Sequence, residues 1–217
     1  MFRYLFLFIA LTGSAQAEPW HVEVAGGYTT FHQYKQDGTR FYQEAFPWSS
    51  DMTSPAGRVG VGQKINDRWA YTVSWLYLGR NSVEALYVHD DDYDPVAHRC
   101  LRGCDKPTHA GAYGSGKGPE FALRRNFESV YIRGGLFVWI ADLNVVGWHQ
   151  GDPKQEYRWR QATQTMLAPF LGVGVRHKFN GWEVFADVSH YVAVESTGGY
   201  PLAKKATVPM LGFKVGL

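Results

Sequence analysis

A serine and a histidine that could support nucleophilic catalysis stand next to each other in the chain, as Ser189 and His190. Acyl transfer needs the serine hydroxyl within hydrogen-bond reach of the histidine, with an acid to orient the ring. Neighbouring residues of a β-strand point to opposite faces, so this pair cannot share a proton if the segment is a strand. The other nearby histidine, His177, is expected at the far end of a neighbouring strand, on the wrong side for the same reaction. We therefore predict no catalytic residues and no enzymatic activity.

A second group of chemically suggestive residues lies between positions 89 and 104. The run from His89 to Asp94 contains clustered carboxylates, which suit Ca²⁺, but it lacks the glycine and distal glutamate of an EF-hand loop. Cys100 and Cys104, with His98 nearby, could be interpreted as a zinc site, although C-x₃-C spacing alone is weak. We expect a solvated acidic loop and a Cys100–Cys104 disulfide, with no metal and no cofactor.

The disulfide prediction depends on export, for which the N-terminus provides the signal. A basic start with Arg3 precedes the apolar stretch 4–12, and Ala15 and Ala17 follow in an A-x-A arrangement. This layout predicts a secretory signal peptide over 1–17, cleaved before Glu18. The remainder, 18–217, suits one β-rich domain. The formal net charge of the full chain, +2, argues against a nucleic-acid-binding protein.

Period-two alternation of apolar and polar residues runs through the mature chain, and this alternation predicts the elements that must position any site. Each alternating segment has about the length that a tilted strand needs to cross a bilayer. The segments are 20–31, 58–64, 69–77, 120–124, 130–140, 167–176, 182–189 and 211–217. We predict an all-β fold, an eight-stranded antiparallel up-and-down transmembrane β-barrel. A secreted soluble β-domain is the alternative.

The connections between these segments are of two kinds. Tight turns are expected at 65–67, 126–128 and 179–181, and long connections at about 32–53, 79–116, 141–164 and 196–205. Short turns on one side and long loops on the other are typical of a transmembrane barrel, with the long loops extracellular. Aromatic residues near strand ends suit the membrane interface. They are Trp20, Trp69, Trp182 and Phe213.

The predicted inward face carries charges of both signs. Eight strands enclose an interior that side chains nearly fill, so these charges predict an ion-pair network in the lumen rather than a conducting path. The barrel-interior charges are Glu23, Arg58, Lys64, Glu120, Arg124, Arg133, Arg176, Glu183, Asp187 and Lys214. Phe137 and Trp139 also fall on this face. Either a bulge at Gly134-Gly135 changes the parity, or these two rings fill the lumen.

The last third of the chain resembles a known family. The stretches APFLGVGVR (168–176), WEVFADV (182–188) and LGFKVGL (211–217) are similar to strands of OmpA-like small outer-membrane barrels. The resemblance implies the eight-stranded membrane domain and a Gram-negative outer-membrane location. Two features depart from the family's pattern: the chain ends in Leu217 instead of Phe or Tyr, and we expect no periplasmic peptidoglycan-binding domain of the kind that longer members of the family have.

These observations together predict an outer-membrane protein with a structural or surface-recognition role, adhesin-like, acting through its extracellular loops. Loop segments 34–48 and 148–159 are rich in aromatic residues with interspersed charges, which suit recognition of a protein or glycan. The expected partners are outer-membrane lipid and lipopolysaccharide, with a host or other surface ligand at the loops and no nucleic acid. An outer-leaflet lipid-modifying enzyme or a narrow transport barrel is the alternative.

Overall fold

The computed structural model describes residues 20–32, 45–87, 93–94, 99–100, 109–149, 152–194 and 203–216. The predicted signal peptide and Cys104 lie outside these ranges. The described strands are β1 (Trp20–His32), β2 (Ala45–Asp51), β3 (Thr53–Lys64), β4 (Trp69–Tyr87), β5 (Tyr93–Asp94), β6 (Arg99–Cys100), β7 (His109–Phe127), β8 (Val130–His149), β9 (Asp152–Lys178), β10 (Trp182–Val192) and β11 (Lys205–Gly216).

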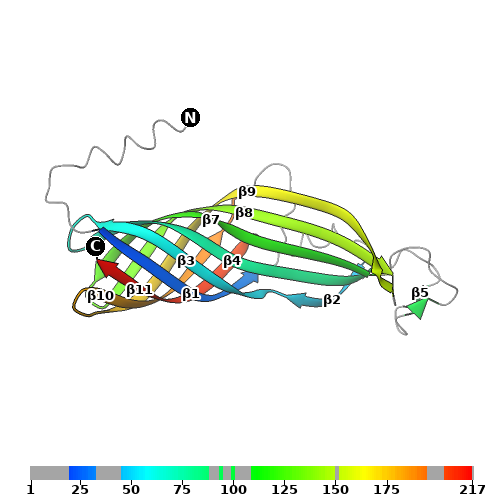
Figure 1. Ribbon diagram of the computed structural model, residues 1–217, viewed down its shortest axis with the longest axis horizontal. Coiled ribbons are helices and arrows are strands. Elements are labelled where there is room, and N and C mark those ends of the chain that lie inside the picture. Colours follow the sequence, from blue (N-terminus) through cyan, green and yellow to red (C-terminus); the bar gives the residue numbers. More distant parts are fainter. Residues whose placement is uncertain are drawn as a thin grey trace, which may run out of the picture.

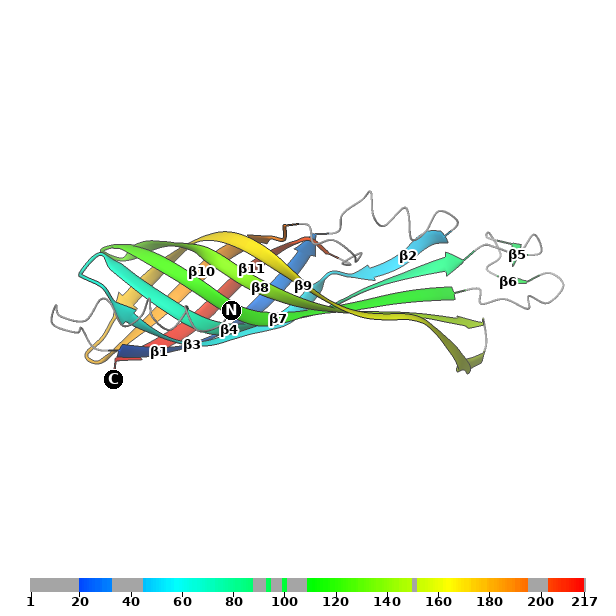
Figure 2. The same cartoon turned by 90° about the horizontal axis from the view of Figure 1, so that it is seen from above.

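The main sheet is antiparallel and closes on itself (Figures 1 and 2). Its strand order is β2-β4-β3-β1-β11-β10-β9-β8-β7, and the ring is completed by pairing of β4 with β7. β2 and β3 both pair with β4 and are separated at Met52, so together they form one side of a long hairpin. The predicted all-β, eight-stranded antiparallel barrel is therefore confirmed. β5 and β6 form a separate two-stranded sheet.

Three tight turns define one end of the barrel, which we call the short-turn end. After β3, the side-chain oxygen of Asn66 accepts hydrogen bonds from the backbone N–H groups of Arg68 and Trp69, both at 2.9 Å. After β9, the N–H of Phe179 donates to the carbonyl of Trp182 at 2.8 Å, and Gly181 has a φ of 85°. Such a positive φ favours glycine because it has no Cβ. β1 begins and β11 ends at this end of the barrel, as His21 opposite Gly216.

At the opposite end, which we call the extended end, several strands continue well beyond the others (Figures 1 and 2). β4 runs on to Tyr87, β7 already begins at His109, and β8 and β9 remain paired as far as His149 opposite Asp152. Much of the expected connections 79–116 and 141–164 is therefore strand. In this region polar outward residues alternate with buried inward residues such as Val83 and Ala112, so the alternation of a strand continues beyond the barrel.

A β-bulge separates the two parts of β4. Its pairing with β7 shifts register between Tyr77 and Gly79, and Gly79 has a φ of 84°. Before the bulge the even-numbered residues of β4 face inward, whereas after it the odd-numbered ones do. The bulge thus changes which parity faces the lumen. In the described part of the chain, no helix is long and apolar enough to cross a membrane.

Candidate functional site

The outer wall of the barrel is apolar. Most outward positions between the two ends carry Val, Leu, Ile or an aromatic residue, and many of these side chains are more than 40% exposed. Leu171 and Leu211, for example, expose 66% and 59% of their surface. Monomeric soluble proteins rarely expose a contiguous apolar patch of more than several hundred Å². The outer wall is therefore the kind of apolar surface that is normally covered by another apolar material and not by water.

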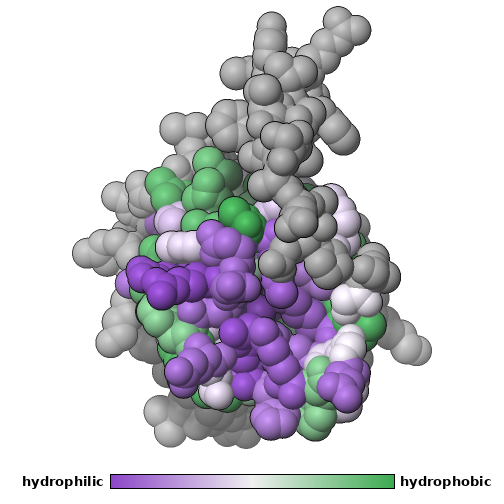
Figure 3. Space-filling view, turned by 90° about the vertical axis from the view of Figure 1, so that its left-hand side faces the viewer, coloured by the Kyte–Doolittle hydropathy of each residue, from purple (hydrophilic) through white to green (hydrophobic). Residues whose placement is uncertain are grey.

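Aromatic rings gather on this wall at the short-turn end. Phe179 stacks on Trp182 with 4.1 Å between ring centroids, and Trp182 lies 6.2 Å from Phe213. Trp20 meets Tyr71 edge to face at 6.4 Å. Exposed Trp and Tyr rings at one level of a wall suit the boundary between hydrocarbon and water. Figure 3 looks onto this end and shows hydrophilic residues gathered across its middle.

The middle of the lumen is occupied by buried ion pairs centred on Arg58. Its guanidinium contacts Asp187 at 2.8 Å, Glu23 at 3.3 Å and Glu120 at 4.0 Å. Arg133 pairs with both Glu120 and Asp187, the latter at 3.5 Å. The hydroxyl groups of Ser74, Tyr131 and Tyr191 add hydrogen bonds to the same carboxylates. We call this group the central network.

A second, smaller group of charges lies toward the short-turn end. Glu183 accepts from Arg124 at 3.1 Å and from Arg176 at 3.3 Å. Lys214 is also buried, and it stands opposite Glu183 in the register of β10 with β11. Lys64 and Arg176 are half-buried, whereas the other eight predicted interior charges are buried. The structure thus places all ten predicted residues on the inward face and joins most of them into ion pairs.

Aromatic side chains fill the lumen on the other side of the central network. Phe137 and Trp139 lie 6.0 Å apart, Phe31 lies 6.2 Å from Trp139, and Phe170 stacks on Tyr191 at 4.9 Å. The pairing of β8 with β7 and β9 runs through Gly134 and Gly135 in constant register. Of the two interpretations of these rings, the bulge is therefore wrong, and they fill the lumen.

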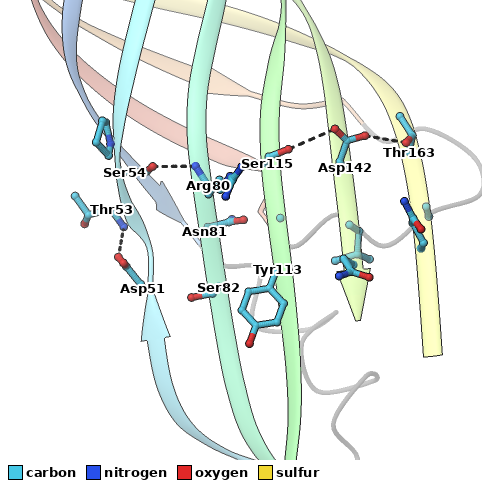
Figure 4. A pocket seen from close by; sticks show the side chains of 16 residues that line it. Asp51, Thr53, Ser54, Arg80, Asn81, Ser82, Tyr113, Ser115, Asp142 and Thr163 are labelled. Atoms are coloured by element: carbon cyan, nitrogen blue, oxygen red, sulfur yellow. Dashed lines mark hydrogen bonds between the residues drawn. The ribbon is translucent and has the colours of Figure 1, made fainter. Parts of the chain in front are cut away.

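A hollow at the extended end gathers polar side chains from several strands. It has a volume of about 710 Å³ and is open to the surroundings (Figure 4). Two cross-strand rows of outward residues line it. The first row consists of Arg80, Ser115, Asp142 and Thr163. The second row consists of Ser82, Tyr113, Asn144 and Gln161. We call it the polar hollow.

Hydrogen bonds hold the first of these rows in place. Asp142 accepts from the Thr163 hydroxyl at 2.8 Å and from the Ser115 hydroxyl at 3.4 Å, and Lys117 lies 3.4 Å from its carboxylate. The backbone N–H of Arg80 donates to the Ser54 hydroxyl at 2.9 Å (Figure 4). The Thr163 hydrogen bond and the positive charge of Lys117 lower the pKa of Asp142, so this carboxylate is charged at neutral pH.

The residues of the polar hollow were not among those predicted from the sequence. They fall within the expected connections 79–116 and 141–164, where we predicted loops. The sequence feature that could have revealed them is the alternation of Arg80 and Ser82 with Asn81 and Val83. The bulge at Gly79 makes the even-numbered residues of this part of β4 face outward, whereas the odd-numbered ones face outward before it. The aromatic loop segments that we expected to carry recognition lie largely outside the described side chains, as does Cys104 with the proposed disulfide.

The serine and histidine considered for catalysis lie on opposite sides of the wall. Ser189 is buried in the lumen, whereas His190 is exposed on the outside, where its Nδ1 is 2.9 Å from the Thr207 hydroxyl. The two side chains cannot exchange a proton across the strand. Among the described residues, no group of three or more His, Cys, Asp or Glu side chains could hold a metal ion.

Comparison with known proteins gives likenesses of structure only. No family model and no curated protein matches the chain. The N-terminal barrel domain of Pseudomonas aeruginosa OprF is 14% identical, with 93% of this chain and all of that chain covered and a TM-score of 0.43. Ail of Yersinia pestis, solved with the heparin analogue sucrose octasulfate, is 10% identical (92% and 99% covered, TM-score 0.49). The Escherichia coli outer-membrane protease OmpT is 9% identical (95% and 100% covered, TM-score 0.49).

Proposed function

We propose that this chain is an outer-membrane barrel of a Gram-negative bacterium whose extended end binds a hydrophilic ligand at the cell surface. The barrel is the scaffold, with the short-turn end in the periplasm and the extended end outside the cell. The observation that carries the proposal is the polar hollow, which the strands build beyond the apolar wall.

The membrane part of the proposal follows from the wall and the ring closure. In lipid, every backbone N–H and C=O must be paired within the protein, and only a helix or a closed barrel achieves this. The main sheet closes through β4 and β7, and its outer wall is apolar over the length that a tilted strand needs to cross a bilayer. On β8 the apolar wall ends at Ile140, and the next outward residue is Asp142.

The surface-recognition part follows from the division between lumen and hollow. The lumen is filled by ion pairs and aromatic rings, which favours a rigid scaffold over a transport path. The polar hollow instead offers a carboxylate, a guanidinium, hydroxyls and amides beside one aromatic ring, Tyr113. Such a mixture suits a hydroxyl-rich or peptide ligand, because each polar group can fix one ligand group while the ring packs against an apolar face.

A non-enzymatic role is part of the proposal. The separation of Ser189 and His190 by the barrel wall removes the pair that the sequence offered for acyl transfer. Among the described residues that line the hollow, Asp51 and Asp142 are the carboxylates, and no histidine is present. The hydroxyls of Ser115 and Thr163 donate to Asp142, but no histidine lies beside them to complete a Ser–His pair for acyl transfer.

The test is binding of intact cells that display the protein to a panel of immobilised glycans and matrix proteins. Arg80→Ala with Tyr113→Ala removes two side chains from the hollow, and we expect these cells to lose binding at least about tenfold. Arg68→Ala, an exposed arginine at the short-turn end, is the matched control and is expected to bind like wild type. Equal binding by the double variant and wild type would show that the hollow is not the recognition surface.

A further inference from the structure

A polar cluster interrupts the apolar outer wall where β1, β10 and β11 meet. Nε2 of His32 and Nδ1 of His190 each lie 2.9 Å from the same hydroxyl oxygen, that of Thr207. The two rings are 5.8 Å apart. Their chain neighbours Phe31, Tyr191 and Ala206 are buried in the lumen, so the cluster itself lies on the outside of the barrel.

The strand register shows what surrounds the cluster. Thr207 stands opposite Thr30 on β1 and opposite His190 on β10. Lys205, one outward position farther along β11, stands opposite His32 and is exposed. Two histidines, two threonines and a lysine thus form a cationic, hydrogen-bonding group on the wall. On the far side of β1, the carboxylate of Asp51 accepts a hydrogen bond from the backbone N–H of Thr53.

An apolar groove of about 540 Å³ runs along the wall immediately below this cluster. The small residues Gly26, Ala186 and Pro209 form the floor of the groove. The larger side chains of Tyr28, Val175 and Leu211 line its sides. The groove spans the two cross-strand rows that precede the row of Thr30, Thr207 and His190. Successive outward residues of a strand are about 6.6 Å apart, so the groove and the cluster together cover roughly the depth of one lipid leaflet.

The cluster has hydrogen-bond donors to offer outward. The Thr207 hydroxyl has one proton, so it can donate to one ring and accept from the other. With both rings neutral in that arrangement, one of the two remaining nitrogens, Nδ1 of His32 or Nε2 of His190, carries a proton. Lys205 adds a full positive charge. An anionic group with several acceptor oxygens fits such a set, and an acyl chain fits the groove below it.

We propose that the groove and the His32–Thr207–His190–Lys205 cluster form a binding site for a phosphorylated lipid of the outer leaflet, lipid A. The acyl chain lies along Gly26 and Ala186, and the phosphate contacts the two histidines and Lys205. The inference rests on the proposed membrane location and orientation, because only these put the cluster at the headgroup level of the outer leaflet. It adds a lipid site on the wall to the ligand surface proposed at the polar hollow.

The experiment measures lipid retention by the purified protein, folded in detergent, using native mass spectrometry. The probes are bisphosphorylated lipid A, the same lipid after phosphate removal, and phosphatidylglycerol. We expect wild type to retain the bisphosphorylated form about tenfold more than the dephosphorylated one, since charge-assisted hydrogen bonds are lost with the phosphates. The triple variant His32→Gln, His190→Gln, Lys205→Gln is expected to lose this preference.

Two further variants separate the parts of the site. His177→Gln with Lys178→Gln removes the same residue types from the short-turn end and is expected to keep the preference. Gly26→Leu fills the groove, where a Cβ at position 26 has no atom within 4 Å, and is expected to weaken retention of both forms of lipid A. Equal retention of the two forms by wild type, preference persisting in the triple variant, or tighter retention of phosphatidylglycerol would each overturn the proposal.

A gel run on the same samples separates the two levels of inference. If unboiled protein migrates differently from boiled protein while the phosphate preference is absent, the barrel stands and the lipid site is wrong. If no variant and no wild-type sample shows a heat-dependent shift, the membrane barrel itself, and with it the proposed function, is wrong.

Discussion

Replacing Arg58 by methionine tests whether the central network stabilises the barrel. The Arg58 side chain is 2% exposed, and its guanidinium contacts Asp187, Glu23 and Glu120. In the central network two arginines face three carboxylates, so one negative charge is in excess. Arg58→Met raises that excess to two inside a lumen from which water is largely excluded.

The expected loss of stability in Arg58→Met depends on which partners each carboxylate retains. Asp187 retains Arg133 at 3.5 Å and the Tyr131 hydroxyl at 3.0 Å, whereas Glu23 loses its ion-pair partner. Removal of one partner from a buried ion pair costs about 3–5 kcal/mol. Because most of the network is retained, we expect Arg58→Met to lower the free energy of unfolding by about 3 kcal/mol, at the lower end of that range.

The assay is equilibrium unfolding in urea of protein refolded into lipid vesicles, followed by tryptophan fluorescence. Adding Glu23→Gln to Arg58→Met removes the uncompensated charge and is expected to recover about 1 kcal/mol or more. Arg80→Met, an exposed arginine of the polar hollow, is the control and is expected to stay within about 1 kcal/mol of wild type. If Arg58→Met matched wild type, the central network would not contribute to stability as described.

Three other perturbations test separate parts of the account. Wild-type protein in planar bilayers is expected to show little conductance, and Phe137→Ala with Trp139→Ala is expected to raise it, because these rings fill the lumen. The lowered pKa of Asp142 means that its contribution to stability is present above its unfolded-state pKa, about 3.9, and is lost as pH falls through the lower folded-state pKa. On acidification, the wild-type protein is expected to lose hydrogen-exchange protection at the extended end. The Asp142→Asn variant has no carboxylate to protonate there and is expected to lose less protection. Gly79→Ala places a Cβ 2.2 Å from the Ser54 hydroxyl at a φ of 84° and should cost about 1–3 kcal/mol in urea unfolding.

The barrel and its inward charges could be predicted from the sequence because alternation is a direct consequence of strand geometry. Each side chain of a strand faces the opposite side from its neighbour, so Glu120 and Arg124 share a face while Phe121 and Leu123 share the other. The pairing of those charges could not be predicted in the same way. Whether Arg58 meets Asp187, 129 positions away, depends on strand register and tilt around the whole ring.

The polar hollow was missed because the chain changes its pattern at the place where the lipid wall ends. Above the wall, outward residues are polar and inward residues small or apolar, as with Asp142 beside Leu143, which is the reverse of the barrel proper. The bulge at Gly79 also shifts the parity of β4, so no single period runs through the strand. A search for reversed alternation on both sides of a glycine would have extended the predicted strands.

The central claim is that the chain closes into a barrel in the outer membrane, and electrophoresis of membrane fractions tests it most directly. A closed barrel resists detergent until it is heated, so unboiled and boiled samples should migrate differently, with the protein confined to the outer-membrane fraction. Identical migration of the two samples, with the protein recovered in the soluble periplasmic fraction or the medium, would contradict the account.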